Sequence, residues 1–375
     1  MTTRVMNFSA GPAALPLPAL ERAQRELLDF AGTGMSVMEQ SHRGKDYEAV
    51  HDEALALLRE VLRVPSSHEI VFVQGGATQQ FAQIPMNFLP PGGKADHLVT
   101  GAFGEKAVEE AQAAAALVGG EVRLAASTGA GAKPAYTRLP TADEMRLDGT
   151  AAYVHYTSNE TINGVQFANQ PGAAYPDFGR VPVVCDMSSE FLSRPFDVSP
   201  FSFIYAGAQK NIGPSGLVVA IARKDFLEGS RQDIPKIFQY RAFVENKSLL
   251  NTPPTFAIYL VRNVLAWVKE IGGLEAIEKR NREKARLLYE ALDARPDFFR
   301  CPVDRAARSI MNVVFRLPTP ALEETFFKEA TKAHLVGIKG HRSVGGVRVS
   351  LYNAVEVEWA RALVDFMENF AKKQG

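Results

Sequence analysis

Lys210 lies in a loop of small residues that directly follows an apolar run at 203–206. Asp186 ends another apolar run at 181–185, one expected strand earlier. Taken singly, each has an ordinary interpretation, because most lysines are exposed and aspartate often caps a helix or turn. Taken together, the two side chains can face one cleft, since ligands of open parallel sheets bind beyond the carboxyl ends of strands.

A Gly-Gly turn supplies a third group. The sequence Gly-Gly-Ala-Thr at 75–78 follows an apolar run at 70–73 and precedes a helical pattern. Small residues at a helix N-terminus let backbone N–H groups reach an anion. The spacing fits neither a dinucleotide-binding fingerprint nor a P-loop. On its own such a turn is most often only a turn, so its meaning depends on the other two groups.

An anion-binding turn, a carboxylate and a lysine at neighbouring strand ends match the needs of pyridoxal 5′-phosphate (PLP). The phosphate needs backbone donors, the pyridine nitrogen needs a carboxylate, and the aldehyde needs a lysine amine for a Schiff base. A lysine held there can also carry the proton that an amino-group transfer moves. The sequence has no metal-type spacing, so we expect no metal.

Two polar loops hold further cations. His42 and Arg43 stand together in the first, and His341, Arg342 and Arg348 stand in or near the second. Arginine binds carboxylate and phosphate through two parallel hydrogen bonds, so the set suits a polyanionic substrate. Surface charge is the ordinary interpretation of any one of them, but the repeated His-Arg pair favours function.

These groups need a fold that brings strand ends together. Apolar runs alternate with helical patterns, which predicts a mostly parallel sheet with helices on both faces. From about residue 300 the order strand, helix, strand, helix predicts a smaller C-terminal α/β domain. We expect residues 16–265 to form the large PLP-binding domain and residues 266–375 the small domain, with residues 1–15 packed near it.

Length and composition limit the class of protein, its partners and its compartment. The 375 residues suffice for a large and a smaller domain. Lys+Arg and Asp+Glu both number 42, which argues against a nucleic-acid partner. Two cysteines and no signal-peptide pattern favour a reducing cytoplasm. No apolar run is long enough to span a membrane, so we expect a cytoplasmic protein.

Seven segments resemble motifs of the phosphoserine aminotransferases, a class-V, fold-type I family of PLP enzymes. They are FSAGPAALP, SVMEQSHRGK, YTSNETINGV, DMSSEFLSRP, IYAGAQKNIGPSGL, NTPPTFAIY and GHRSVGGVR, and the resemblance covers essentially the full length. It implies a large domain with a mostly parallel seven-stranded sheet flanked by helices, a smaller C-terminal α/β domain, and a homodimer with shared active sites.

The resemblance also implies roles for single residues. Lys210 would form the Schiff base, Asp186 would pair with the pyridinium nitrogen, and Arg348 would hold the substrate α-carboxylate. Further cofactor contacts would come from Ala77, Thr78, Thr161 and Gln209, and from Asn251 and Thr252 of the other subunit. The distal phosphate or the glutamate side chain would be held by His42, Arg43, His341 and Arg342, one or two of them supplied by the partner.

Phe103 is the one departure from the family pattern. Members often place tryptophan over the cofactor ring, in the loop after the third apolar run, and Phe103 stands at that position. A phenyl ring still stacks, with less area and no N–H.

The resemblance implies reversible transamination of O-phospho-L-serine with 2-oxoglutarate, which gives 3-phosphooxypyruvate and L-glutamate in serine biosynthesis. 4-Phosphooxy-L-threonine of pyridoxine biosynthesis is a further candidate substrate. One alternative is another class-V aminotransferase, of the alanine–glyoxylate or serine–glyoxylate type, which would not need both His-Arg pairs. The other is a non-catalytic binding protein, against which the intact Lys210 and Asp186 argue.

Overall fold

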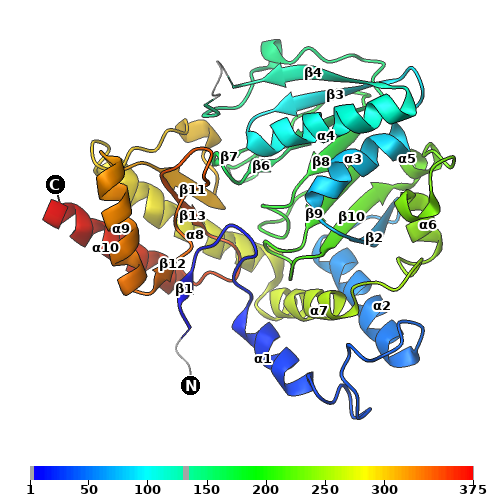
Figure 1. Ribbon diagram of the computed structural model, residues 1–375, viewed down its shortest axis with the longest axis horizontal. Coiled ribbons are helices and arrows are strands. Elements are labelled where there is room, and N and C mark those ends of the chain that lie inside the picture. Colours follow the sequence, from blue (N-terminus) through cyan, green and yellow to red (C-terminus); the bar gives the residue numbers. More distant parts are fainter. Residues whose placement is uncertain (1–3, 130–134, 375) are drawn as a thin grey trace.

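A computed structural model describes residues 4–129 and 135–374. A seven-stranded sheet with helices on both faces forms the larger part, and the part of the chain from within α8 (Gly273–Ala294) onward lies at one end of it (Figure 1). The expected α/β class and the expected seven-stranded sheet are therefore confirmed.

The sheet is mostly parallel, as predicted. In spatial order the strands are β2 (His68–Gln74), β10 (Leu217–Arg223), β9 (Phe203–Gly207), β8 (Val183–Asp186), β5 (Tyr153–Thr157), β3 (Lys94–Val99) and β4 (Glu121–Ser127). Six strands run in one direction, and only β10 is antiparallel to both of its neighbours. All residues of β5, β8 and β9 are buried, as expected for strands that are covered on both faces.

Alternate strand residues feed two hydrophobic cores. On β8, Cys185 packs with residues of α2 (Lys45–Val61) and α7 (Thr255–Glu270), whereas Val184 packs with the helices of the opposite face. The helices of that face are α3 (Ala77–Phe88), α4 (Ala102–Val118), α5 (Lys224–Glu228) and α6 (Tyr240–Glu245). Of these, α3 and α4 lie side by side in Figure 1.

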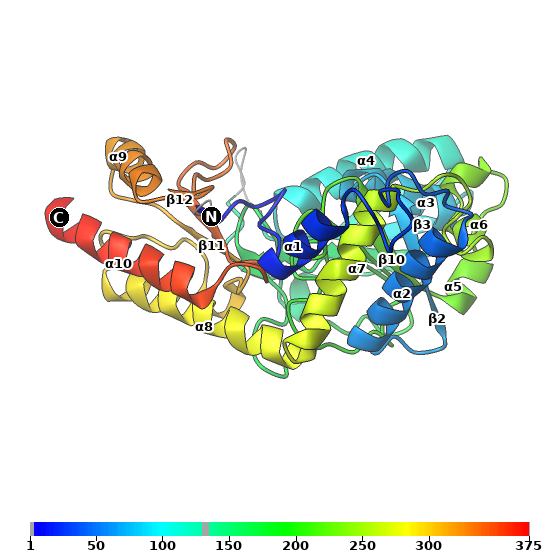
Figure 2. The same cartoon turned by 90° about the horizontal axis from the view of Figure 1, so that it is seen from below.

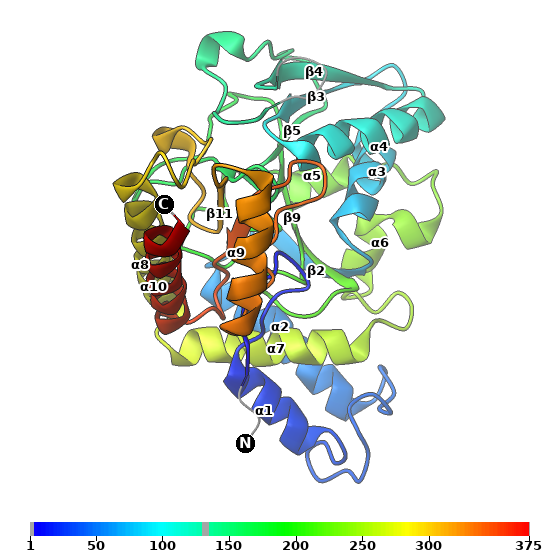
Figure 3. The same ribbon diagram turned by 60° about the vertical axis from the view of Figure 1, so that its left-hand side comes forward.

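The C-terminal part has its own core. There α8 (Gly273–Ala294) and α10 (Val357–Gln374) pack side by side (Figures 2 and 3). The antiparallel pair β11 (Asn312–Phe315) and β13 (Val347–Ser350) lies against them, and α9 (Pro320–Lys332) comes between these two strands in the chain. Near the N-terminus, β1 (Met6–Asn7) pairs with β12 (Leu335–Val336), so the start of the described chain joins this part.

The two cores meet within α8. Ile277 still belongs to the core of the large sheet, and Ala285 belongs to the C-terminal core. The expected boundary at 265/266 falls inside α7, whose side chains share a hydrophobic core with the large sheet. We therefore propose that the division into domains lies between Ile277 and Ala285.

Lys284 lies on α8 just before Ala285 and is wholly buried. Its Nζ donates to the carbonyls of residues 351, 352 and 355 at 2.9, 2.8 and 3.0 Å.

The segment between α1 (Leu17–Glu26) and α2 exposes large apolar side chains. Leu28 is 84% exposed, Met38 is 52% exposed and Met35 is 43% exposed. Such a cluster is typical of a surface that contacts another molecule. No helix in the described part of the chain is long and apolar enough to cross a bilayer.

Candidate active site

Lys210 lies in the turn after β9, where its amine is enclosed by protein. The residue is 9% exposed, and Nζ donates a hydrogen bond to Thr161 Oγ1 at 2.7 Å. Burial lowers the pKa of the amine to about 8, and nearby Asp186 and Glu160 oppose this change. At pH 7 about a tenth of the amine is then in the neutral form that a nucleophile or base requires, far more than for an ordinary lysine.

Asp186 is the last residue of β8 and is 3% exposed. Its Oδ1 accepts hydrogen bonds from the N–H (2.8 Å) and the hydroxyl (2.5 Å) of Ser188. Ser188 Oγ in turn accepts the N–H of Gly207 at 3.0 Å, which ties the ends of β8 and β9 together. Burial raises the pKa of the carboxyl, and the positive charge of Lys210 counteracts this. Within the described residues Oδ2 has no hydrogen-bond donor, so it can take one from a ligand.

The Gly-Gly turn opens α3, as the sequence predicted. Gly75 has φ +105°, a conformation that favours glycine, and Gly76 is the N-cap of the helix without a capping side chain. Ala77 and Thr78 are the first two helical residues, so their N–H groups have no acceptor inside the helix. The Gln209 side chain lies against Gly207: a Cβ added at Gly207 would come within 2.7 Å of the Gln209 amide oxygen.

Phe103 is the second residue of α4, and its ring lies beside the amine. Lys210 Nζ is 5.0 Å from the ring centroid, and Lys106 Nζ is 5.5 Å from it. The structure therefore brings Phe103 into the site.

Three further cations share one region. Arg348 on β13 is half-buried, its Nε has no hydrogen-bond partner in the described chain, and burial lowers its pKa. Burial also lowers the pKa of His341, and the positive charges of Arg348, Lys106 and Arg342 lower it further. Within residues 4–129 and 135–374, neither these three side chains nor Lys106 forms an ion pair. A cavity of about 270 Å³ adjoins Arg348, and Asn163 and Gly340 also line it.

Other predicted residues lie apart from this region. His42 and Arg43 are in the loop before α2, and no described side chain of the site bonds to them. Asn251 Nδ2 donates to Gln74 Oε1 of the same chain at 2.9 Å, next to the Gly-Gly turn, and Thr252 is exposed. The single chain thus assembles the lysine, the aspartate and one His-Arg pair but not the other pair.

Sequence reasoning missed Glu160, Lys106 and Ser188. Glu160 is wholly buried beside the site, and burial raises its pKa to about 7 against the effect of its hydrogen bonds to α4. Its position directly before Thr161 was the only signal. Lys106 could have been found, because it lies three residues after Phe103 and so on the same side of a helix.

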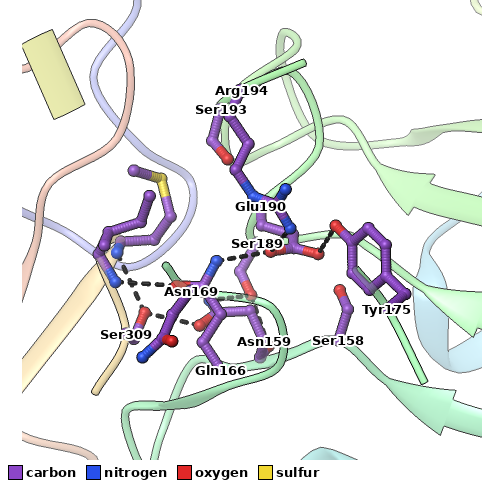
Figure 4. Close-up of polar contacts among 12 residues, drawn as sticks. Ser158, Asn159, Gln166, Asn169, Tyr175, Ser189, Glu190, Ser193, Arg194 and Ser309 are labelled. Atoms are coloured by element: carbon purple, nitrogen blue, oxygen red, sulfur yellow. Dashed lines mark hydrogen bonds and ion pairs between the residues drawn. The ribbon is translucent and has the colours of Figure 1, made fainter. Parts of the chain in front are cut away.

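A network of hydrogen bonds to the Asn159 side chain holds the Asn159–Thr161 segment in place. Figure 4 shows Asn159 between Ser189 and Ser309: its Nδ2 donates to Ser189 Oγ at 2.7 Å, and its Oδ1 accepts from Ser309 Oγ at 2.6 Å. The same Nδ2 donates to Asn312 Oδ1 at 2.8 Å on β11. Thr161 is therefore attached to both the sheet and the C-terminal part.

The residues present fit PLP. They offer a helix N-terminus for the phosphate, a buried carboxylate with one free oxygen for the ring nitrogen, an aromatic ring, and a buried amine with a lowered pKa.

Comparison with known proteins gives consistent matches. The family model described as aminotransferase class-V matches residues 5–363. The phosphoserine aminotransferase of Niallia circulans is 50% identical over 375 residues and covers 100% of both chains. A solved structure of the phosphoserine aminotransferase from Bacillus circulans subsp. alkalophilus is 50% identical, with a TM-score of 0.93 and complete coverage of both chains. The PLP-bound enzyme of Trichomonas vaginalis is 41% identical, with a TM-score of 0.91 over 97% of this chain and 100% of that one.

Proposed function

Since the chain belongs to the class-V aminotransferase family and is a PLP-dependent enzyme, we propose that it transfers the amino group of O-phospho-L-serine to 2-oxoglutarate. The products are 3-phosphooxypyruvate and L-glutamate, and the reaction is reversible. The observation that carries this substrate choice is the group of cations without ion-pair partners in the described chain: Arg348, His341, Arg342 and Lys106. A substrate with one carboxylate needs only one of them, whereas a phosphorylated amino acid needs several.

Each residue of the site has a proposed role. Lys210 and Asp186 are the catalytic pair, and Arg348 binds the α-carboxylate common to both substrates. His341 and Arg342, with His42 and Arg43, bind the distal phosphate or the side-chain carboxylate. The remaining cofactor contacts are Ala77, Thr78, Phe103, Thr161, Gln209, Asn251 and Thr252.

The chain's own groups account for binding and proton transfer. Bound PLP supplies an electron sink for the charge that develops when the substrate Cα loses its proton. Lys210 Nζ accepts that proton, and its lowered pKa suits both uptake and release near neutral pH. Thr161 Oγ1 holds the amine on one side, 2.7 Å away. Asp186 would hold a negative charge beside the ring nitrogen of bound PLP, and Arg348 would fix the α-carboxylate and hence the Cα–H bond.

A homodimer would complete the site. His42 and Arg43 lie far from Arg348 along the chain, and the apolar cluster around Leu28 precedes them directly. We propose that this cluster packs against a second copy, which then offers its His42 and Arg43, together with Asn251 and Thr252, to the site of its partner.

Mixing two inactive variants tests the shared site. A dimer of one Lys210→Ala and one Arg43→Ala subunit has one site with both lesions and one with neither. If the arginine acts across the interface, random mixing restores about a quarter of wild-type activity. If it acts within its own subunit, every site keeps one lesion and the mixture stays inactive.

The substrate is tested by single half-reactions. The enzyme is mixed with O-phospho-L-serine or with L-serine, and the cofactor spectrum is followed in time. We expect conversion by the phosphorylated substrate with a kcat/KM at least about 100-fold higher, because charge-assisted hydrogen bonds contribute about 1.5–3 kcal/mol each. Equal conversion, or fast reaction of alanine with glyoxylate, would identify the enzyme as the other type of class-V aminotransferase.

We propose that the enzyme acts in serine biosynthesis in the cytoplasm. 4-Phosphooxy-L-threonine carries the same phosphate and α-carboxylate, so the same cations can bind it, and pyridoxine biosynthesis is a second proposed use. A half-reaction with that compound, run beside O-phospho-L-serine, compares the two.

A further inference from the structure

One loop holds the whole first turn of α4. Asn163 Oδ1 accepts the N–H of Ala102 at 3.0 Å. The two carboxylate oxygens of Glu160 accept the N–H groups of Phe103 (3.0 Å) and Gly104 (2.8 Å). The first N–H groups of a helix lack acceptors within it, and here a segment more than fifty residues away accepts those of Ala102, Phe103 and Gly104.

Capping alone does not account for Glu160. A serine or aspartate at the N-cap position, where Gly101 stands, would cap the helix locally and contribute about 1 kcal/mol. Glu160 is 0% exposed, and no described cation lies within ion-pair distance of it. Removing an ionised carboxylate from water costs several kcal/mol, which exceeds what a cap returns. The raised pKa of Glu160 reflects the same cost.

Gly101 is needed because of this carboxylate. Its φ of 176° is extended backbone that any residue adopts. A Cβ there, however, would lie 2.3 Å from the Glu160 carboxyl carbon and 2.5 Å from Oε2. The sequence thus keeps space open for the Glu160 side chain.

Glu160 stands between the two groups that flank the reactive amine. It binds the backbone of Phe103, whose ring centroid is 5.0 Å from Lys210 Nζ. It is joined by a peptide bond to Thr161, which accepts the hydrogen bond of the same Nζ at 2.7 Å. We propose that Glu160 is a positioning residue of the active site, whose carboxylate fixes the Phe103 ring relative to Thr161 and so sets the tilt of the bound cofactor ring against Lys210. This inference rests on the proposed function.

The test replaces one carboxylate oxygen. Glu160→Gln keeps the shape but presents an NH₂ group, a donor, to one of the two N–H groups. Glu109→Gln is the matched control, because Glu109 is an exposed residue of the same helix. With PLP bound, we expect the visible circular dichroism of the cofactor to fall by about half in Glu160→Gln and to stay unchanged in the control. We expect kcat to fall about tenfold, with KM within about twofold, because the loss is one of orientation.

Gly101→Ala gives a second route that leaves Glu160 in place. Its Cβ displaces the carboxylate, so it should reproduce the dichroism change. In a Glu160→Ala background the space is free, and adding Gly101→Ala should then change the dichroism little further. A lower melting temperature in Glu160→Gln and Gly101→Ala with unchanged dichroism and kcat would show that Glu160 only caps the helix, and the proposal would be wrong. If the wild type fails to transaminate O-phospho-L-serine, the proposed substrate is wrong, while the dichroism comparison still decides the role of Glu160.

Discussion

Replacing Lys210 by methionine should change how the stability of the cofactor-free protein depends on pH. Burial lowers the pKa of this amine from 10.5 to about 8. Between these two values the unfolded chain holds a proton at Lys210 that the folded protein has lost, so the free energy of unfolding rises with pH in this window. One pKa unit corresponds to about 1.4 kcal/mol, and the whole effect is therefore about 3 kcal/mol.

Urea unfolding of cofactor-free wild type and Lys210→Met at pH 7, 8.5 and 10 measures the effect. Methionine keeps the length and the apolar stem of lysine but cannot titrate. From pH 8.5 to 10, the wild type should gain about 2 kcal/mol relative to Lys210→Met. Lys332→Met, at an exposed position of α9, is the control and should follow the wild type. Parallel curves for wild type and Lys210→Met would refute the lowered pKa and, with it, the explanation of how the amine is made reactive.

Three further substitutions test the site. Phe103→Trp should tighten cofactor binding by about two- to tenfold through added stacking area, and an unchanged dissociation constant of PLP would count against the ring contact. Arg342→Ala should lower kcat/KM for O-phospho-L-serine by about 30-fold, from the loss of charge-assisted hydrogen bonds, and lower that for glutamate much less; equal losses would show that it does not select phosphate. Asn312→Ala should lower the free energy of unfolding by about 2 kcal/mol, because the buried amides and hydroxyls that bond to Asn312 lose a partner. A urea midpoint equal to that of the wild type would show that these hydrogen bonds do not contribute to stability.

The strand ends could be predicted from the sequence because each is a local event. An apolar run stops, and Asp186 or the Lys210 loop follows; the sheet geometry then brings these ends together. The start of α3 at Ala77 follows from its two glycines in the same way. Even the reversed β10 has a local cause, because the segment 208–216 is too short for the crossover that a parallel strand requires.

The role of Glu160 could not be predicted, because it depends on contacts between distant segments. In sequence it belongs to the polar stretch Ser-Asn-Glu-Thr, which resembles any exposed loop. Only the folded chain places it beneath the first turn of α4, and only there does the need for Gly101 become visible. Asn251 is similar: its contact with Gln74 joins residues with no pattern in common.

Lys284 shows that enclosing an amine does not by itself make it reactive. Burial lowers the pKa of Lys284 as it does that of Lys210. All three N–H donors of Lys284 are taken by main-chain carbonyls, however, which cannot move away without opening the C-terminal core. Lys210 donates to a single hydroxyl, which can turn and accept a different donor when the amine leaves. Of the two buried lysines in the described chain, Lys284 is therefore held in place, whereas Lys210 can turn to react with an aldehyde. The selectivity for Lys210 over Lys284 follows from how rigidly their hydrogen-bond acceptors are held.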